Sequence, residues 1–322
     1  MMFTEIGRNI EKAARLLQNG EVVAIPTETV YGLAGNALSE AAVTKIYAAK
    51  KRPSFNPLIL HIANIDQIIC YATPNAISLK LANAFMPGPL TLLLPKKNNV
   101  PDITTAGSNK VAIRVPNHPL ALELLYQINF PLAAPSANQS GYISPTTAQH
   151  VYEGLNHKIS YILDGGTSIV GLESTICEVM NDHILLHRTG GISANMLQDA
   201  TGLPVIDGAS HERLQTPGQL KSHYAPNTPL YRGNIETLID QHRGKKMAVI
   251  SFYKKFAHSD NIDYYILSET ANLSEAANKL FSTLREIDAQ ENYEVIITEI
   301  FPEEGIGPAI NDRLNRAQFI HK

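Results

Sequence analysis

The sequence predicts an α/β protein in two domains, and three observations predict it. The chain has 322 residues, 44% of them hydrophobic and 18% charged, which is enough apolar material for two cores. Strand patterns alternate with helical patterns over residues 1–202 and again over residues 230–322. Between them, residues 203–229 are rich in Pro, Gly and polar residues and lack sustained periodicity, which is typical of a long linker.

The elements of the first domain follow from periodicity and capping residues. Apolar residues at helical spacing from Ile6 to Leu17 predict an amphipathic N-terminal helix that ends at Gly20. Residues 22–26 form a buried-strand pattern, and residues 39–50 predict a helix with a serine N-cap. Further strands are expected at residues 58–62, 90–94, 111–115, 131–135, 159–163, 174–180 and 183–187, and further helices at residues 64–71, 75–85 and 193–200, with another that begins at Pro145. This mixture predicts a mixed, twisted sheet.

The second domain follows from the same patterns. Strands are expected at residues 247–252, 264–267 and 294–298, and helices at residues 272–287 and 308–319. This alternation predicts a smaller α/β domain.

Composition excludes several classes of protein. No stretch approaches the ~20 consecutive apolar residues that span a bilayer, and the N-terminus has no signal-peptide pattern. Cys70 and Cys177 are too few for a disulfide framework and lack metal-ligand spacing, so we expect both in apolar surroundings. A reduced, cytoplasmic setting is therefore expected.

The formal net charge of −3 is unevenly distributed. Residues 45–114 carry nine basic against two acidic side chains, an excess of +7, whereas residues 260–304 carry eleven acidic against two basic ones, an excess of −9. The first segment is suited to a polyanion that the second would repel. Solvated surfaces without a special function account for the counts equally well.

The common catalytic motifs do not occur. The sequence has no phosphate-binding P-loop, no complete glycine-rich dinucleotide motif, no metalloprotease motif and no hydrolase nucleophile elbow. The eleven histidines show no metal-like spacing. With these motifs excluded, a less common chemistry remains, and its site is expected among polar residues at strand ends and in loops.

Four polar segments of this kind follow predicted strands or helices. They are residues 26–33 (PTETVYGL), 50–58 (KKRPSFNPL), 135–146 (PSANQSGYISPT) and 165–191, which contains GLESTI and RTGG. The hydroxyl and amide groups of the third segment suit phosphate or ribose oxygens, and two prolines hold the second segment rigid around Asn56. Taken singly, each segment also fits an ordinary interpretation: a capped loop, a basic helix end that interacts with the helix dipole, an N-cap turn or a glycine turn.

Together, these segments resemble the YrdC-type threonylcarbamoyl-AMP synthases in their longer, two-domain form. The resemblance covers residues 20–226 in family order and returns in GIGPAINDRLNRA at residues 305–317. Its segments are PTETVYGLAGNA, IYAAKKRPSFNPLILHI, MPGPLTLLL, VAIRVPNHP, APSANQSGYISPTT, GLESTI, HRTGGIS and TPGQLKSHYAP. The resemblance implies a YrdC-like catalytic domain with a twisted mixed sheet, a long linker and a smaller C-terminal Rossmann-like domain.

The resemblance also implies a reaction. L-threonine and bicarbonate or CO2 form a carbamate, which attacks the α-phosphate of ATP and expels pyrophosphate. The enzyme would be a nucleotidyltransferase that uses Mg2+ with ATP, and its product would pass to the downstream tRNA threonylcarbamoyl-transferase machinery, with at most a weak contact to tRNA itself. Such a transfer needs no covalent protein nucleophile, which agrees with the missing nucleophile motifs.

The expected site residues are carried over from the family by position. Lys50 and Arg52 match its K-x-R pair. Ser136 and Asn138 match its S-x-N pair, and these four residues are expected to be catalytic. The residues expected to bind ATP are Arg52, Asn56, Lys110, Ser136, Asn138, Ser144, Arg188, His223 and Tyr224. The residues expected to bind threonine are Thr29, His61, Arg114, Ala134 and Ser174, with Arg114 as the partner of the carboxylate. No direct protein ligand is expected for Mg2+, which would arrive with ATP.

The linker segment around Pro217 and His223 matches a part of the family that folds over the site, so a lid is expected. The sequence departs from the family pattern at residues 219–222 (QLKS), where a basic–aromatic–basic run is usual. It also departs at Lys110, where a small hydroxyl residue is usual, and at Thr189, where a proline is usual. None of these departures affects the K-x-R or S-x-N pair.

Two other functions remain open. An RNA-binding module of the YrdC type without its own chemistry would use the basic segment, although interleaved aromatic residues are few. Transfer of the carbamoyl group to another acceptor, as in hydrogenase-maturation proteins with this domain, is disfavoured by the matches in the threonine pocket. RNA binding would weaken steeply with salt, whereas the enzyme would release pyrophosphate only with ATP, Mg2+, threonine and bicarbonate together.

Overall fold

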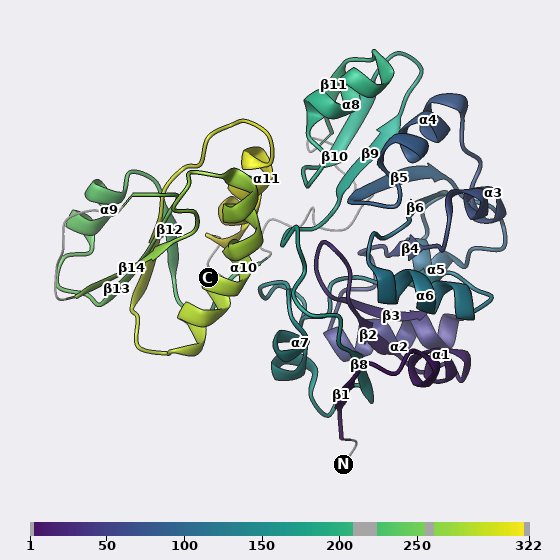
Figure 1. The fold of residues 1–322 in the computed structure, drawn as a ribbon, viewed down its shortest axis with the longest axis horizontal. Helices are drawn as coiled ribbons and strands as arrows, with labels where there is room; N and C mark the ends of the chain where they lie inside the picture. Colours follow the sequence, from purple (N-terminus) through teal and green to yellow (C-terminus); the bar gives the residue numbers. More distant parts are fainter. Residues whose placement is uncertain (1–2, 209–223, 255–260, 319–322) are drawn as a thin grey trace.

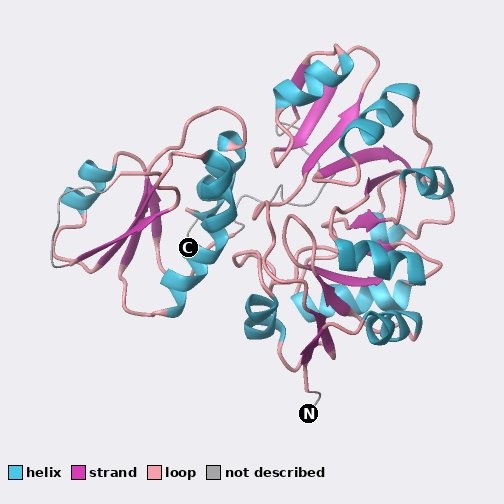
Figure 2. Ribbon diagram, viewed as in Figure 1, coloured by secondary structure: helices cyan, strands magenta, loops and turns pink. Residues whose placement is uncertain are grey.

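The computed structural model describes residues 3–208, 224–254 and 261–318, which form two α/β domains side by side (Figure 1). The first domain is built on an eleven-stranded mixed sheet, and the second on a four-stranded sheet whose strand pairs are all parallel. Figure 2 shows the helices around both sheets, with α10 and α11 on the side of the second domain that faces the first. The predicted fold class is therefore confirmed.

The first sheet has the strand order β1-β8-β2-β3-β7-β4-β6-β5-β9-β10-β11. Its strands are β1 (Glu5–Gly7), β2 (Val23–Ile25), β3 (Gly32–Asn36), β4 (Ile59–His61), β5 (Leu90–Pro95), β6 (Lys110–Arg114), β7 (Leu132–Ala133), β8 (Tyr161–Leu163), β9 (Thr175–Val179), β10 (Ile184–Arg188) and β11 (Val205–Asp207). Its helices are α1 (Ile10–Gln18), α2 (Glu40–Lys50), the 3-10 helix η1 (Ile65–Gln67), α3 (Ile68–Tyr71), α4 (Ala76–Phe85), α5 (Asp102–Thr105), α6 (Pro119–Gln127), α7 (Ala148–Leu155) and α8 (Ala194–Thr201).

The N-terminal helix begins later than the sequence predicted. Ile6 lies in β1, which pairs in parallel with β8 at one edge of the sheet. Helix α1 starts at Ile10, because the Asn9 side chain accepts a hydrogen bond from the Lys12 amide and so caps the helix there. A residue whose spacing fitted the helix is thus part of a strand.

Three further predictions need correction. The helix predicted from Pro145 is α7, which is capped by Thr147, because the Pro145 carbonyl accepts a hydrogen bond from the amide of Tyr31 in a neighbouring loop. Residues 205–207, which were predicted to be linker, form β11 and pair with β10. Cys70 is exposed on a short helix, whereas Cys177 is buried as predicted.

Alternation along β6 separates the core from the site. Val111 and Ile113 join the main core cluster together with Leu60 of β4, and burying such side chains contributes roughly 1.5–3 kcal/mol each. Successive residues of a strand point to opposite faces, so the next residue, Arg114, leaves this core. The parallel register of β4 and β6 then places Arg114 beside His61 at the ends of the two strands.

The second domain has the strand order β12-β15-β13-β14. Its elements are β12 (Leu230–Arg232), α9 (Ile235–Gln241), β13 (Met247–Ser251), β14 (Ile262–Ile266), α10 (Leu273–Ala289), β15 (Val295–Thr298) and α11 (Gly307–Ala317). Val30, Ile143 and Leu172 of the first domain belong to the same buried apolar cluster as Phe281 of α10 and Leu314 of α11. The interface between the domains is therefore a continuous apolar core. No helix among the described residues has the length and apolar character needed to cross a membrane.

Candidate active site

A cavity lies where strands of the first domain end. Tyr224, the first described residue after the linker segment, forms part of its wall. The cavity is lined by nine of the residues that the sequence singled out: Thr29, Arg52, His61, Arg114, Ala134, Ser136, Ser174, Arg188 and Tyr224. The enclosed space is about 40 Å³, which is room for one or two water-sized groups. A larger ligand has to extend beyond this space or displace its walls.

We name the two halves of the cavity after the substrates that the family resemblance implies for them, and the threonine half is centred on Arg114. Its guanidinium donates from Nε to the Gly88 carbonyl at 3.1 Å and from Nη1 to the Thr29 hydroxyl at 2.9 Å. Its Nη2 lies 2.6 Å from Glu28 Oε1, and both side chains of this ion pair are almost completely buried. Glu28 was not among the predicted site residues; it follows β2 by three residues and partners Arg114 from the neighbouring loop.

His61 lies beside Arg114 and carries no charge at ordinary pH. Burial, with a further contribution from the Arg114 charge, lowers the pKa of His61 to about 3. Its Nδ1 lies 3.2 Å from the Ile59 carbonyl. The ring therefore supplies a neutral hydrogen-bonding group to the cavity. Ser174, on the other wall of this half, shares a 2.8 Å hydrogen bond with the buried Thr91 hydroxyl.

The other half, which we call the nucleotide half, contains Arg52, Ser136 and Arg188. Arg52 is fixed by Asn56: its Nη2 donates to Asn56 Oδ1 at 2.6 Å and its Nε to the Asn56 carbonyl at 3.1 Å. Arg188 donates to the Ser174 carbonyl at 2.9 Å and to its hydroxyl at 3.0 Å. Ser174 thus connects the two halves, and Asn56 acts through Arg52 without lining the cavity.

Lys50 lies behind the cavity wall and holds the segment that carries Ser136. Its Nζ donates to the main-chain carbonyls of Ser136 and, at 2.6 Å, of Asn138. The Asn138 amide in turn donates to the carbonyls of Gln139 and Tyr142 at 2.8 and 2.7 Å. The K-x-R and S-x-N pairs are therefore joined by direct hydrogen bonds, although only Arg52 and Ser136 reach the cavity surface.

The nucleotide half carries positive charge that its own carboxylates do not balance. In the described part of the chain, no carboxylate oxygen lies within ion-pair distance of Lys50 or Arg52. Burial, and secondarily the charge of Arg52, lowers the pKa of Lys50 well below its ordinary value. Burial also lowers the pKa of Arg52 to about 10. An anion bound here would relieve the cost of keeping both groups charged.

Ser144 and Lys110 are not brought to the cavity surface. The Ser144 side chain is completely buried and donates to Glu173 Oε1 at 2.5 Å, and Glu173 lines the cavity. Lys110 stands at the far end of β6 from Arg114 and forms an ion pair with Glu178. Its predicted contact with ATP stays a prediction. Glu173 was missed because it is an acidic residue in a segment expected to bind phosphates.

His223 lies outside the described residues, as do Pro217 and residues 219–222. Tyr224 follows them directly and is described: it lines the cavity, and its ring stacks on Phe281 of α10 with the ring centroids 5.4 Å apart. The backbone amide of Ala225 donates to the Gly141 carbonyl at 2.9 Å. The chain is thus fixed between both domains where it leaves this segment.

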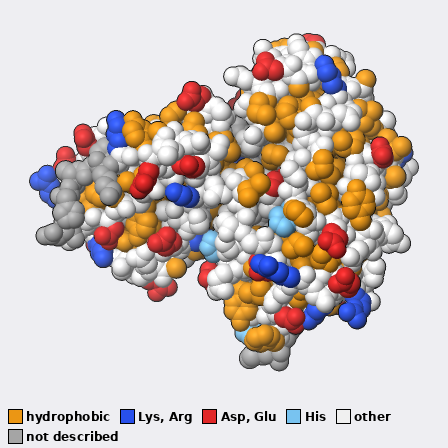
Figure 3. Space-filling model, viewed as in Figure 1, with side chains coloured by type: hydrophobic (Ala, Val, Ile, Leu, Met, Phe, Trp, Pro, Cys, Tyr) orange, Lys and Arg blue, Asp and Glu red, His pale blue; other side chains and the backbone are white. Residues whose placement is uncertain are grey.

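The basic segment of the sequence does not form one exposed surface. Three of its nine bases, Lys50, Arg52 and Arg114, are buried at the site. Figure 3 shows basic and acidic side chains scattered over both domains on the face drawn, without a continuous basic area. The charge excess of residues 45–114 therefore partly reflects the interior of the site.

Two family models match this chain. Residues 15–190 match a model described as "Telomere recombination" (Sua5_yciO_yrdC). Residues 192–318 match a model described as "Threonylcarbamoyl-AMP synthase, C-terminal domain".

Curated relatives match over nearly the full chain. A threonylcarbamoyl-AMP synthase of Bacillus subtilis is 43% identical over 321 residues, which is 96% of this chain and 92% of the relative. One from Pyrococcus abyssi is 39% identical over 325 residues, which is 96% of this chain and 93% of the relative.

Solved structures agree. The crystal structure of P. abyssi Sua5 complexed with L-threonine superposes with a TM-score of 0.88 at 37% identity and covers 99% of this chain and 97% of that one. A full-length structure of HypF in its phosphate- and nucleotide-bound form shares only the fold of the first part, at 22% identity, a TM-score of 0.50 and 57% of this chain.

Proposed function

The chain belongs to the two-domain threonylcarbamoyl-AMP synthase family, and from this premise we propose the reaction that its site carries out. The protein forms threonylcarbamoyl-AMP and pyrophosphate from L-threonine, bicarbonate or CO2, and ATP. In class terms it is a nucleotidyltransferase that supplies the threonylcarbamoyladenosine modification of tRNA. The downstream tRNA threonylcarbamoyl-transferase machinery consumes the product.

The observation that carries this proposal is the meeting of two different sets of side chains in one cavity. Arg52, Ser136 and Arg188 suit a polyanion, and Arg114 with neutral His61 suits a small zwitterion. The wall between the two sets is Ser174, which is bonded to Arg188. Two substrates bound on either side of Ser174 would have their reacting ends next to each other.

The threonine half would bind the amino-acid carboxylate through Arg114. Because Glu28 already lies 2.6 Å from Arg114 Nη2, the carboxylate has to share this guanidinium with Glu28 or displace it. The related P. abyssi Sua5, crystallised with L-threonine, supports this assignment for the chain as a whole. Thr29, Ala134 and Ser174 would complete the pocket.

The nucleotide half would bind and polarise the phosphates of ATP through Arg52 and Arg188, with Lys50 holding the Ser136 segment in place. One unit-charge pair at 4 Å is worth roughly 4 kcal/mol at an effective dielectric constant near 20. Several such contacts would offset the repulsion between the carbamate and the triphosphate. The carbamate oxygen then forms a bond to the α-phosphorus as the bond to the pyrophosphate oxygen breaks, and pyrophosphate carries away the electron pair.

Mg2+ fits this site as a companion of ATP. No group of three or more His, Cys, Asp or Glu side chains able to hold a metal occurs in the described ranges. Asn138 Oδ1 is buried without a hydrogen-bond partner, and a water molecule of a hydrated magnesium ion would donate to it, so the ion needs no direct protein ligand. Bound with ATP, the ion would neutralise phosphate charge next to Ser136 and Asn138.

The linker is proposed as a lid over the nucleotide. Tyr224, which lines the cavity, directly follows this segment in the sequence, and the family resemblance implies that His223 contacts the nucleotide. Closure would exclude water from a product that water hydrolyses. An RNA-binding module without chemistry is not favoured, because the relatives at full coverage are synthases and the central bases are buried.

The decisive experiment is mass spectrometry of the product after incubation of the protein with ATP, Mg2+, L-threonine and bicarbonate. We expect threonylcarbamoyl-AMP and pyrophosphate in the complete mixture and neither when threonine or ATP is left out. Pyrophosphate release that does not depend on threonine would contradict the proposal. RNA retention that weakens steeply with salt, without product, would favour the binding module instead.

A further inference from the structure

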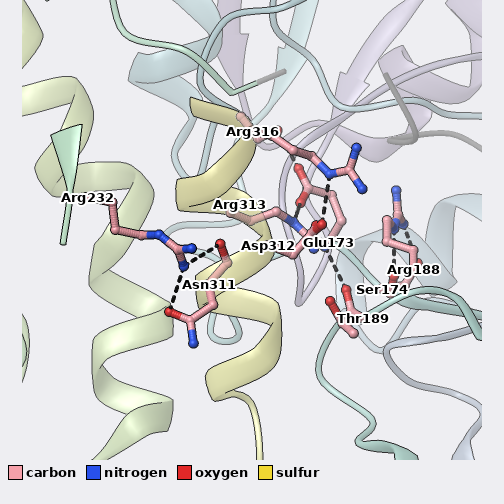
Figure 4. A network of polar contacts seen from close by, with 10 residues as sticks. Glu173, Ser174, Arg188, Thr189, Arg232, Asn311, Asp312, Arg313 and Arg316 are labelled. Carbon is pink, nitrogen blue, oxygen red and sulfur yellow. Dashed lines mark hydrogen bonds and ion pairs between the residues drawn. The ribbon is translucent and has the colours of Figure 1, made fainter. Parts of the chain in front are cut away.

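The second domain reaches the nucleotide half through a buried arginine. Arg313 on α11 is 1% exposed and donates from Nε to Glu173 Oε2 at 2.9 Å. It also donates to the Thr189 carbonyl at 2.9 Å and to Asp312 Oδ2 at 2.8 Å. Its guanidinium carbon lies 5.4 Å from the centre of the Tyr224 ring. All three guanidinium nitrogens are thus engaged, and two of them bind the first domain (Figure 4).

Glu173 connects this arginine to residues that are expected to bind ATP. One carboxylate oxygen accepts from Arg313 and the other from the Ser144 hydroxyl at 2.5 Å. The next residue, Ser174, is held by Arg188, which donates to both its carbonyl and its hydroxyl. Figure 4 shows Arg313 on α11 pointing toward Glu173 of the first domain, with Ser174 and Arg188 nearby. The loop before β9 is therefore fixed from the second domain on one side and by Arg188 on the other.

The charge of Glu173 makes the pairing necessary. Burial alone would raise the pKa of this carboxyl, but Arg313 first, and then Arg188 and Ser144, hold it below its ordinary value, so the group is ionised. Glu173 lines the cavity. An ionised carboxylate there repels a triphosphate unless its charge is neutralised, and without Arg313 it would attract the neighbouring Arg188 away from the nucleotide.

We propose that Arg313 is a positioning residue for the nucleotide half: it neutralises and orients Glu173, whose other oxygen holds the buried Ser144, so that Arg188 remains in place to meet ATP. This inference rests on the proposed function, because it assumes that the nucleotide half binds ATP. It gives the second domain a direct part in the reaction. Completion of the site then requires a residue that lies 140 positions after its partner.

The alternative is that the Arg313–Glu173 ion pair only holds the two domains together. Its loss would then lower the thermal midpoint and leave the KM values for both substrates unchanged. The positioning role instead predicts a selective effect on ATP, because Ser144 and Arg188 lie on that side. It also predicts that removing the carboxylate charge compensates for the loss of the arginine, which a lost domain contact would not show.

The test compares Arg313→Met, Arg313→Lys, Glu173→Gln and the double variant Arg313→Met/Glu173→Gln in the full chain. Arg232→Met is the matched control, since Arg232 contacts the same helix through Asn311 within the second domain. The readouts are the KM for ATP, the KM for threonine, kcat, the Kd of a non-hydrolysable ATP analogue by calorimetry, and the thermal midpoint.

We expect Arg313→Met to raise the ATP KM and the analogue Kd at least tenfold, with the threonine KM within twofold. The double variant should return the ATP KM to within threefold of wild type, and Arg313→Lys should lie between, because lysine keeps the charge but loses two donors. Arg232→Met should stay within twofold throughout. Equal changes in both KM values, or a double variant no better than the single one, would overturn the proposal.

Two arms keep the outcome decisive. Should Arg313→Met fail to fold, Arg313→Lys and the double variant carry the comparison, and an ATP KM unchanged in both overturns the positioning role. The wild-type arm reports on the proposed function separately. Absence of threonylcarbamoyl-AMP there refutes the reaction, whereas a normal wild type with unselective variants refutes only the role of Arg313.

Discussion

In the threonine half of the site, Arg114 and its counter-ion Glu28 both come from the first domain, from a strand end and a neighbouring loop. In the nucleotide half, Glu173 comes from the first domain but is paired with Arg313 of the second. Both ion pairs are almost completely buried. They differ in that the Arg114–Glu28 pair forms within one domain, whereas the Arg313–Glu173 pair forms only when the two domains pack together.

A second arginine of the second domain repeats this arrangement on the nucleotide side. Arg285 of α10 donates to the Ile143 carbonyl at 2.6 Å and approaches those of Ser144 and His150 at 3.4 Å. Its guanidinium carbon lies 5.0 Å from the centre of the Tyr142 ring. The loop that carries Ser144 is thus held from behind by α10, whereas among the described residues no side chain of α10 or α11 bonds to Arg114, His61 or Thr29. The first domain alone builds the threonine half, whereas the nucleotide half depends on both domains.

The largest expected effect is at Lys50. Lys50→Met should lower kcat/KM about 10^3-fold, because two buried carbonyls lose their donor, at about 1–3 kcal/mol each, and the Ser136 segment is no longer held in place. The fold should be retained, since methionine fills the space without a buried charge. Lys45→Met is the matched control on the same helix, because Lys45 is half-exposed and pairs with Glu21. Pyrophosphate release above a tenth of the wild-type rate would remove Lys50 from the machinery.

Arg114→Met sharpens the comparison on the threonine side. We expect the threonine KM to rise about 10–100-fold, because charge-assisted hydrogen bonds are worth roughly 1.5–3 kcal/mol, and the ATP KM to stay within threefold. Adding Glu28→Gln should not restore threonine binding, since here the arginine itself is the ligand. Recovery in the Arg114→Met/Glu28→Gln variant would show that both ion pairs act in the same way.

Arg285→Met tests whether the second domain supports only the nucleotide half. A buried carbonyl that loses its donor costs about 1–3 kcal/mol, so the free energy of unfolding should fall by that amount in urea titrations. The ATP KM should rise about three- to tenfold as the Ser144 loop loosens. A threonine KM that rises equally would mean that the dependence on the second domain extends to the whole site.

Acid stability should report on two histidines, His61 in the threonine half and His150 on α7. The pKa of His61 is lowered to about 3 by burial and by Arg114, and that of His150 to about 4 by burial and by Arg285. Below their unfolded-state pKa near 6.5, the unfolded chain takes up protons that the folded protein does not, so stability falls as the pH drops. Each group contributes up to about 1.4 kcal/mol per pH unit. His61→Gln should flatten the slope of the unfolding free energy between pH 6.5 and 4.5, and an unchanged slope would mean that His61 is protonated in the folded protein.

The smallest effect is expected at Lys110. It stands four residues along β6 from Arg114, about 13 Å at the usual rise of a strand, and it is paired with Glu178. Lys110→Ala should therefore change the ATP KM by less than twofold. A tenfold rise would establish the ATP contact that the family resemblance implies and would extend the nucleotide half toward this end of the strand.

Most strands of the first sheet were predictable from the sequence, even where they are short. Strand β7 is only two residues long, yet the strand expected at residues 131–135 contains it, because a short apolar run between turn residues already indicates a buried strand. Helix α2 was found with its Ser39 cap because eleven residues carry both a periodicity and a terminal signal. Strand β3 and helix α6 were not found: the sequence of β3 contains two glycines, which disfavour a strand, and α6 begins without a side-chain cap.

In the site, residues within a local sequence pattern were predictable, and residues whose role depends on a distant partner were not. Arg52, Ser136 and Arg114 were found because each lies in a local segment with its own pattern. Glu28 and Glu173 were missed, although both lie in the polar segments of the sequence, because the role of each carboxylate depends on an arginine far away in the chain. A carboxylate beside a phosphate site is unfavourable unless an arginine neutralises it. No local sequence pattern can identify that arginine when it lies 140 positions away, as Arg313 does from Glu173.

The pairing across 140 positions also bears on how the protein is made. At ~5–20 residues per second, a ribosome adds Arg313 roughly 7–28 s after Glu173. For most of that interval, once Asp207 at the end of β11 has been added, every strand of the first sheet is synthesised but Glu173 still lacks its partner. A chain broken off by early termination or proteolysis would in the same way retain a threonine pocket and lack a competent nucleotide site. On the proposed role of Arg313, such fragments would bind the amino acid without consuming ATP.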